Sequence, residues 1–213
     1  MSLLQGGQEE WEKVPLPEKI RVIERYTALL EEHKERLAGI LTSEVGKPLQ
    51  QSRNEINGAI GRTKWMTAHA EKYLAEEKMT QQEGMTEMIR YEPLGVIGNI
   101  SAWNYPYLVG TNVFIPALLA GNSVLYKPSE HATLTGCEIA SLLKAAGVPE
   151  SVFQVAIGGA AVGECMLDLP LNGYFFTGSY RTGKYIYEKV APKMVVCQCE
   201  LGGKDPLYVA DDI

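Results

Sequence analysis

Hydrophobic residues in the first third of the chain recur at helical spacing. From Pro17 to about Thr42, apolar residues alternate with Glu and Lys, which predicts an amphipathic helix. Gly46-Lys47-Pro48 ends this pattern, because glycine suits a left-handed helix terminus and proline disfavours helix in the residue before it. A second helix is expected to continue to about Glu77, and Met1 to Lys13 is expected to be a frayed start.

The pattern changes after this helical region. Gln81 to Gly84 form a polar connection, and Met85 to Tyr91 alternates weakly, which indicates a strand. From Gly95 onward, short apolar runs alternate with helix-like stretches, as in a doubly wound α/β domain. The predicted strands cover residues 95–100, 123–126, 152–157, 174–177, 194–200 and 207–210, and the predicted helices cover residues 107–120, 134–146, 161–167 and 181–191.

The expected fold is therefore α/β, with a Rossmann-like parallel sheet, flanking helices and two long N-terminal helices. We expect residues 1–90 to supply the N-terminal helices and an oligomerisation strand, and residues 91–213 to form the Rossmann-like core. With 213 residues, of which 46% are hydrophobic and 22% charged, the chain is long enough to bury a core.

Charge and cysteine content limit which kinds of partner and which cellular location are expected. A formal net charge of −6 gives no basic footprint for nucleic acid, and no apolar run is long enough to cross a bilayer. Cys137, Cys165, Cys197 and Cys199 lie in core-like segments with no signal peptide before them, which predicts reduced thiols and a cytoplasmic location. Only three histidines and no Cys-x-x-Cys pair are present, so no metal site is expected.

Two polar clusters follow predicted strands. Trp103-Asn104-Tyr105-Pro106 comes after the strand at 95–100, and Lys127-Pro128-Ser129-Glu130 comes after the strand at 123–126. Parallel strands bind ligands beyond their carboxyl ends, so both clusters are expected to converge on one crevice. Asn104 can donate to a developing oxyanion or cap the next helix. Lys127 and Glu130 can hold ribose hydroxyls or form a solvated turn.

Two later segments also carry candidate chemistry. Glu200 precedes Leu201-Gly202-Gly203, where backbone can approach a ligand closely, and it is either a general base or a surface carboxylate. The segment 178–184 matches a phosphate-binding loop up to Lys184, but Tyr185 replaces the hydroxyl that ligates magnesium. What remains is a strand-to-helix turn at Ser179 whose free amides favour a phosphate group.

Taken together and in order, these segments resemble the dinucleotide-binding portion of the aldehyde dehydrogenase superfamily. The resemblance covers nearly the whole chain and rests on Pro93-Leu94-Gly95-Val96-Ile97-Gly98, Trp103-Asn104-Tyr105-Pro106, Pro116-Ala117-Leu118-Leu119-Ala120-Gly121-Asn122, Lys127-Pro128-Ser129-Glu130, Phe176-Thr177-Gly178-Ser179 and Glu200-Leu201-Gly202-Gly203-Lys204. The family oxidises aldehydes to acids with NAD or NADP, through a cysteine nucleophile.

The resemblance implies a role for each matching residue. Asn104 would donate to the oxyanion, and Glu200 would be the general base. Lys127 and Glu130 would hold the adenosine ribose, which favours NAD over NADP. The full set of implied cofactor contacts is Ser101, Trp103, Asn104, Lys127, Pro128, Ser129, Glu130, Gly158, Gly178, Ser179 and Leu201.

The resemblance also implies what this stretch lacks. The family's nucleophilic cysteine lies downstream of the segment Glu200 to Lys204, and none of the four cysteines occupies that place. Two functions therefore stay open: the cofactor domain of an aldehyde dehydrogenase, and a non-catalytic dinucleotide-binding or assembly module. In either case the family resemblance predicts a homo-oligomer, and the complete enzyme would take a small aldehyde as its substrate.

Overall fold

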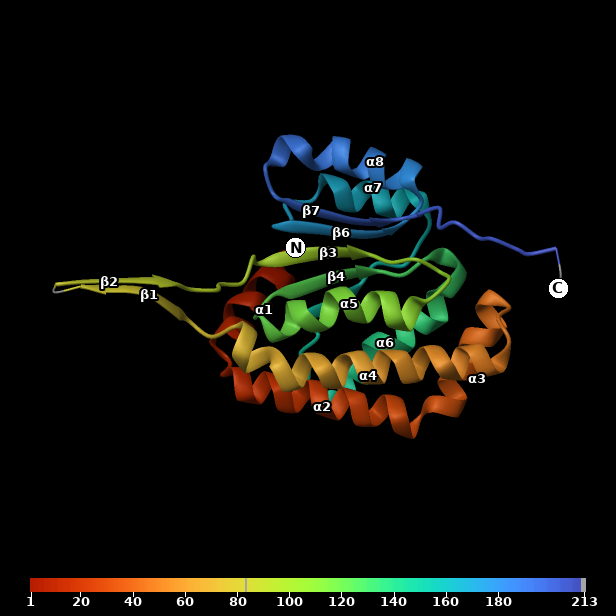
Figure 1. The fold of residues 1–213 in the computed structure, drawn as a ribbon, viewed down its shortest axis with the longest axis horizontal. Helices are drawn as coiled ribbons and strands as arrows, with labels where there is room; N and C mark the ends of the chain where they lie inside the picture. Colours follow the sequence, from red (N-terminus) through yellow and green to blue (C-terminus); the bar gives the residue numbers. More distant parts are fainter. Residues whose placement is uncertain (83, 212–213) are drawn as a thin grey trace.

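The strands at the centre of the molecule are all parallel. The computed structural model describes residues 1–82 and 84–211 and contains a five-stranded sheet of order β5-β4-β3-β6-β7 (Figure 1). Its strands are β3 (Val96–Ile100), β4 (Ser123–Lys127), β5 (Phe153–Val155), β6 (Gly173–Gly178) and β7 (Val196–Leu201). The chain starts in the middle, builds outward to β5, then crosses back past β3. The order reverses between β3 and β6, where sheets of this kind bind ligands.

Helices cover both faces of this sheet, which confirms the predicted doubly wound fold. On one side lie α5 (Pro106–Leu119) and α6 (Thr133–Ala146), and on the other lie α7 (Ala160–Asp168) and α8 (Tyr180–Val190) (Figure 1). Short 3-10 turns occur at Glu130–Ala132 and Ala191–Lys193. The middle strand β3 is almost wholly buried, as expected for a continuous apolar run in a parallel sheet.

The N-terminal region forms more helices than predicted. α2 (Leu16–Glu32) and α3 (Lys34–Val45) replace the single helix expected from Pro17, because the backbone at His33 leaves the helical region, with φ −97° and ψ 9°. α3 ends at Gly46 in the left-handed conformation, as predicted, and α4 (Leu49–Tyr73) follows. The second predicted helix thus ends four residues early.

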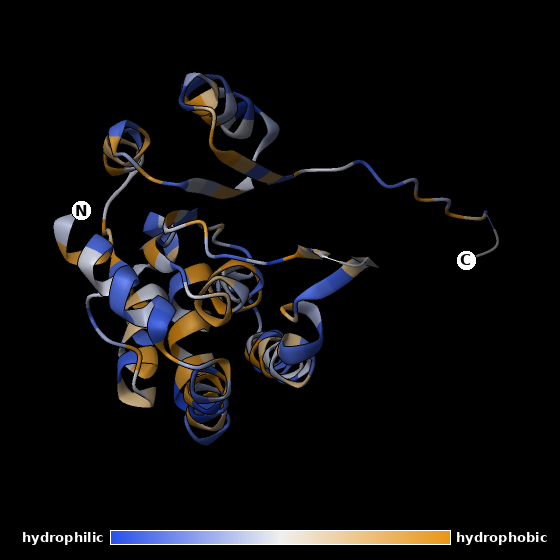
Figure 2. Cartoon of the chain, turned by 90° about the vertical axis from the view of Figure 1, so that its left-hand side faces the viewer, coloured by the Kyte–Doolittle hydropathy of each residue, from blue (hydrophilic) through white to orange (hydrophobic). Residues whose placement is uncertain are grey.

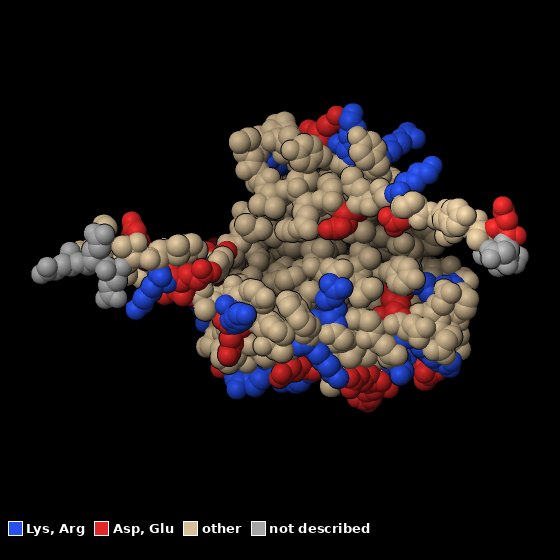
Figure 3. All heavy atoms as spheres, in the orientation of Figure 1, with Lys and Arg blue, Asp and Glu red and all other residues tan. Residues whose placement is uncertain are grey.

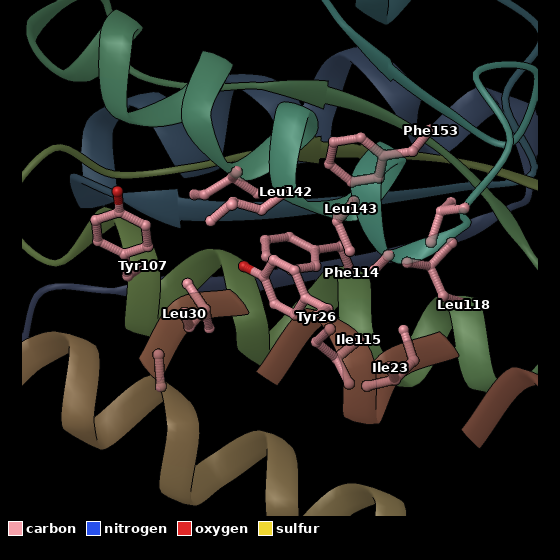
Figure 4. Packing of buried hydrophobic residues seen from close by; sticks show 14 of the residues in the cluster. Ile23, Tyr26, Leu30, Tyr107, Phe114, Ile115, Leu118, Leu142, Leu143 and Phe153 are labelled. Carbon is pink, nitrogen blue, oxygen red and sulfur yellow. The ribbon is translucent and has the colours of Figure 1, made fainter. Parts of the chain in front are cut away.

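These helices share their core with the sheet layer. Ile23, Tyr26 and Leu30 of α2 belong to one cluster of buried residues with Phe114 of α5 and with residues of α6 and β5 (Figure 4). Tyr26 meets Phe114 edge-on, with ring centroids 6.4 Å apart. The N-terminal helices are therefore part of one hydrophobic core with α5 and α6, and they support the layer from which the functional cleft is built.

The prediction of a frayed start is wrong. Residues Ser2–Lys13 form α1, and Leu4, Gly7 and Trp11 lie three or four positions apart on its buried side. The Trp11 indole donates a hydrogen bond of 2.8 Å to the backbone oxygen of Leu118 at the end of α5. This apolar stripe is short and lies among polar residues, so its helical spacing becomes clear only once the surface that buries it is known.

Two neighbouring glycines test the docking of α1. A Cβ at Gly7 would lie 2.0 Å from the backbone oxygen of Ser151, whereas a Cβ at Gly6 would meet nothing within 4 Å. Gly7→Ala is expected to lower the free energy of unfolding by about 2 kcal/mol through overpacking. Gly6→Ala, the matched control, is expected to raise it by about 0.5–1 kcal/mol through helix propensity. Urea denaturation of both variants measures the difference; equal effects would mean that α1 does not pack on this loop.

A two-stranded ribbon projects from the body. β1 (Glu77–Gln82) pairs antiparallel with β2 (Met85–Ile89), and it includes residues expected to form only a polar connection (Figure 1). The strand predicted at Met85 to Tyr91 is confirmed, although it lies outside the main sheet. All five residues of β2 are exposed.

The prediction of a strand at 207–210 is wrong. This stretch is extended and exposed, and it runs away from the body (Figures 1 and 2). Leu207 and Tyr208 are almost fully exposed, because no strand or helix of the described residues packs against them. Within the part of the chain that the structure describes, no helix is both long enough and apolar enough to cross a membrane.

Candidate functional site

A cleft of about 600 Å³ opens at the carboxyl ends of β3, β4, β6 and β7. It lies at the point where the strand order reverses, and it brings together the two polar clusters that follow β3 and β4, as the sequence predicted. Ten of the residues proposed from the sequence line it: Ser101, Trp103, Asn104, Lys127, Ser129, Glu130, Gly178, Ser179, Glu200 and Leu201. Pro128 and Gly158 do not line it. Pro128 faces Gly136 of α6, and Gly158 takes a φ of 148° in the loop after β5.

Among the described residues that line the cleft, Lys127 is the only lysine or arginine. Its side chain is 6% exposed, and its ammonium donates to the Pro128 backbone oxygen at 3.3 Å and lies 3.9 Å from the Glu130 carboxylate. Burial lowers the pKa of Lys127 from its ordinary value, and the Glu130 charge opposes that shift. A buried ammonium with so few fixed partners is suited to donate hydrogen bonds to a ligand.

The start of α8 faces the same cleft. Ser179 is its N-cap: the hydroxyl accepts from the Thr182 amide at 3.2 Å and donates to the Thr182 hydroxyl at 3.0 Å. The first backbone amides of a helix have no partner within the helix, and the helix dipole adds positive potential there. The turn from β6 through Gly178 to α8 therefore presents free donors to an anion in the cleft.

Asn104 does not cap α5, which removes one of the two interpretations left open by the sequence. The amide of Tyr107 at the start of α5 donates instead to Glu55 of α4, at 2.8 Å. The Asn104 side chain bends back so that its Oδ1 accepts from the Tyr105 amide at 3.1 Å. The Nδ2 end of the side chain is then left as the donor, on an exposed residue that lines the cleft.

Glu200 lies between two hollows. It lines the cleft described above and also a second cleft of about 580 Å³, bounded by α5 and by residues of β3, β6 and β7. Thr177, its neighbour across the β6–β7 pairing, lines both as well. The face shown in Figure 3 is hollowed between α5 and these strands. A carboxylate in this position can act on a molecule that reaches it from either side.

One hydrogen-bonded pair in the cleft carries no signal in the sequence. Tyr185 of α8 donates a hydrogen bond of 2.8 Å to Glu164 of α7, and both line the cleft. This contact directs the Tyr185 hydroxyl toward the neighbouring helix, which agrees with the expectation that Tyr185 does not ligate magnesium. No motif marks Glu164, whose position depends on how α7 and α8 pack.

The cleft also contains an unsatisfied polar atom. The Ser101 hydroxyl is buried and has no hydrogen-bond partner among the described residues, and Ser101 belongs to the cleft lining. Buried polar groups are almost always hydrogen-bonded, so this hydroxyl needs a partner, which can be the neighbouring Tyr126 hydroxyl, a water molecule or a ligand. Together with Lys127 and the start of α8, it fits a polar ligand that carries both hydroxyls and phosphates.

None of the four cysteines lines this cleft. Cys137 and Cys165 lie on α6 and α7, while Cys197 and Cys199 lie on one side of β7 and pack beneath α8. Burial raises the pKa of the Cys197 thiol to about 12, so it stays protonated at neutral pH. The cleft lining has donors, a cation and carboxylates, and no thiolate.

Comparison with known proteins gives a consistent match along the chain. Residues 4–213 match the family model described as "Aldehyde dehydrogenase family". An N-succinylglutamate 5-semialdehyde dehydrogenase of Legionella pneumophila (strain Corby) is 31% identical over 202 residues, covering 94% of this chain and 41% of the relative. A 3-sulfolactaldehyde dehydrogenase of Pseudomonas putida is 31% identical over 204 residues, covering 95% and 42% respectively. The chain thus spans about two fifths of the length of these relatives.

Solved structures agree with this match. An NAD-dependent aldehyde dehydrogenase from Sinorhizobium meliloti superposes with a TM-score of 0.88 at 31% identity, over 92% of this chain and 39% of that one. A 3,6-anhydro-L-galactose dehydrogenase in complex with NAP gives a TM-score of 0.91 at 29% identity, over 99% and 45%. The five-stranded sheet and its flanking helices are therefore those of the N-terminal part of such proteins.

Proposed function

The chain belongs to the aldehyde dehydrogenase family, and from this premise we propose that it is the cofactor-binding part of an enzyme that oxidises an aldehyde to a carboxylic acid. One observation carries the proposal. The cleft at the reversal of the sheet gathers Lys127, Glu130, the start of α8, Asn104 and Glu200. These groups suit a dinucleotide at one end and carbonyl chemistry at the other.

The dinucleotide would lie along the ends of the strands. Lys127 and Glu130 after β4 would hold the adenosine ribose, the cation donating and the carboxylate accepting. The pyrophosphate would lie at the start of α8, against Ser179 and beside Trp103. The bound dinucleotide would give the buried Ser101 hydroxyl a hydrogen-bond partner, and Leu201 would line the nicotinamide end. The geometric support is that all of these residues line one cleft.

The chemistry would take place at the far end of the cleft. Bound NAD would supply the hydride acceptor for aldehyde oxidation. Asn104 would donate from Nδ2 to the oxygen that becomes negative when the carbonyl is attacked. Glu200 would accept a proton from the water that releases the acid. Its place between the two clefts supports this role, because aldehyde and water could approach from the second cleft while the cofactor fills the first.

The cleft is better suited to NAD than to NADP. Among the residues that the structure describes, three carboxylates line it, Glu130, Glu164 and Glu200, against the single lysine at position 127. The 2′-phosphate of NADP would add charge beside Glu130, whose carboxylate is already 3.9 Å from the Lys127 ammonium. Repulsion and the loss of a charged hydrogen bond therefore act in the same direction.

We also infer that this chain self-associates through its ribbon. Met79, Met85, Met88 and Ile89 of β1 and β2 are all at least 41% exposed, and a ribbon that stands away from the body leaves strand edges unpaired. An exposed apolar strand is a template for pairing with another chain. A second copy of the same chain would cover both the methionines and the edges.

The alternative, a non-catalytic dinucleotide-binding or assembly module, has one observation in its favour. No cysteine thiol lines the cleft, so the covalent step of aldehyde oxidation has no nucleophile within the described residues. The enzyme and a dinucleotide-binding module both predict cofactor binding by the 213-residue chain, and they differ in whether the chain acts together with a thiolate. An assembly module predicts no cofactor binding.

The purified chain is expected to bind about one NAD per chain and to reduce none of it when aldehydes are added, because binding needs the cleft and turnover needs the thiolate. Calorimetry measures the first quantity, and absorbance of the reduced cofactor with a panel of aldehydes measures the second. Failure to bind NAD would contradict the proposed cofactor site. Turnover that Glu200→Gln abolishes would show that the thiolate is not essential.

A further inference from the structure

Two side chains from the N-terminal helices hold the turn that carries Asn104. This turn, Trp103 to Tyr105, is exposed at all three positions, so its own side chains do not pack it into place. Lys47, between α3 and α4, and Glu55, on α4, reach it from the adjacent helical layer. They are 57 and 52 residues away in the sequence from the groups they bind.

Lys47 makes three contacts with its ammonium group. It donates to the backbone oxygen of Asn104 at 2.5 Å and to Glu55 Oε2 at 2.5 Å, and it lies 4.0 Å from the centre of the Tyr105 ring. The Lys47 side chain is 11% exposed. The ammonium therefore links the turn to α4 in a partly desolvated place, where charged hydrogen bonds and cation–π contacts are stronger than in water.

Glu55 completes the connection. Its side chain is fully buried, its Oε2 accepts from Lys47, and its Oε1 accepts from the Tyr107 amide at the start of α5. Burial raises the pKa of Glu55, while Lys47 and the backbone amides oppose that shift. The carboxylate thus fixes the residue that follows the turn, and the ammonium fixes the backbone of the turn itself.

We propose that Lys47 and Glu55 are positioning residues that fix Asn104 for oxyanion stabilisation, an inference that rests on the proposed function. Asn104 is held at both ends, by Lys47 at its carbonyl and by the Tyr105 amide at Oδ1, so that Nδ2 alone is free to donate. An oxyanion donor must be placed to within about 0.5 Å, which an exposed turn without anchors does not achieve. A buried ion pair gives little net stability, so placement explains this pair better than stability does.

Nuclear magnetic relaxation of the 15N-labelled chain, recorded without cofactor, tests this proposal. In the parent chain, the order parameters of the Asn104 and Tyr105 amides are expected to be about 0.85, as in rigid backbone. Lys47→Met is expected to lower both below about 0.6, and Lys47→Arg is expected to restore them. Lys64→Met is the control, because Lys64 forms an equally short pair with Glu31 on the exposed surface of α4 and α2.

A second variant covers the case in which Lys47→Met unfolds by leaving Glu55 buried without a partner. The double variant Lys47→Met/Glu55→Gln removes both charges and keeps an acceptor for the Tyr107 amide, and it is expected to free Asn104 while α5 stays intact. The proposal is overturned if the turn is already mobile in the parent, or if it stays rigid in the folded variants that lack the ammonium. Weak NAD binding would count against the proposed function alone, since this measurement uses no cofactor.

Discussion

The chain is expected to bind NAD at least about tenfold more tightly than NADP, and Glu130→Gln is expected to remove most of that preference. Glu130 is half-exposed in the cleft lining, next to the buried Lys127 ammonium. A carboxylate that accepts from ribose hydroxyls contributes about 1.5–3 kcal/mol through charged hydrogen bonds. The 2′-phosphate of NADP removes one such bond and adds repulsion, which Lys127 offsets only in part.

Calorimetric titration of both cofactors into the parent and variant chains measures this ratio. Glu188→Gln is the matched control. It makes the same change in net charge as Glu130→Gln, at a residue of α8 that does not line the cleft. It is expected to leave the ratio unchanged. If the parent binds NADP as tightly as NAD, or if both substitutions alter the ratio equally, Glu130 does not hold the ribose.

Lys127→Met is expected to weaken NAD binding about 30-fold and to make the cofactor-free chain more stable by about 1 kcal/mol. The two effects have opposite signs because the buried Lys127 ammonium opposes folding but favours ligand binding. Its ammonium is desolvated in the folded chain and fully hydrated in the unfolded chain. Removing it therefore relieves a cost of folding and deletes a donor to the ribose.

The pH dependence of stability follows from the lowered pKa of Lys127. Between this lowered value and the ordinary value of 10.5, the unfolded chain binds more protons than the folded chain. The free energy of unfolding of the parent should rise with pH in that window, and this increment should be absent from Lys127→Met. Urea denaturation across that window, with exposed Lys184→Met as control, measures it. A Lys127→Met variant that is less stable than the parent and binds NAD equally well would show that Lys127 has neither role.

The main sheet could be predicted from the sequence because its strands and helices carry strong local signals. Val96 to Ile100 and Ser123 to Lys127 are compact apolar runs, and Gly147 closes the helix between two of the strands in the left-handed conformation. The crevice followed from topology, since polar residues just past parallel strands must meet at one edge. The family resemblance then assigned roles to residues that local pattern alone left ambiguous.

What the sequence did not reveal depends on contacts between distant segments. α1 is held by Trp11 against Leu118, and its stripe of buried residues is too short to stand out. Glu55 is a carboxylate in a polar helix until the fold brings it to the Tyr107 amide. The same holds for Glu164, which gains its place through Tyr185. The expected strand at 207–210 failed for the converse reason, because apolar residues form a strand only where a partner strand is available.

The cleft where the strand order reverses is expected to bind a dinucleotide. Titration of the 15N-labelled chain with NAD, followed by amide spectra, tests it most directly. The signals of Ser101, Gly163 and Ser179 are expected to shift together along one saturable curve, while those of Thr27 and Ala68 in the groove between α2 and α4 stay fixed. Unchanged cleft signals at about 10 mM NAD, a concentration that saturates even a weak site, would contradict it.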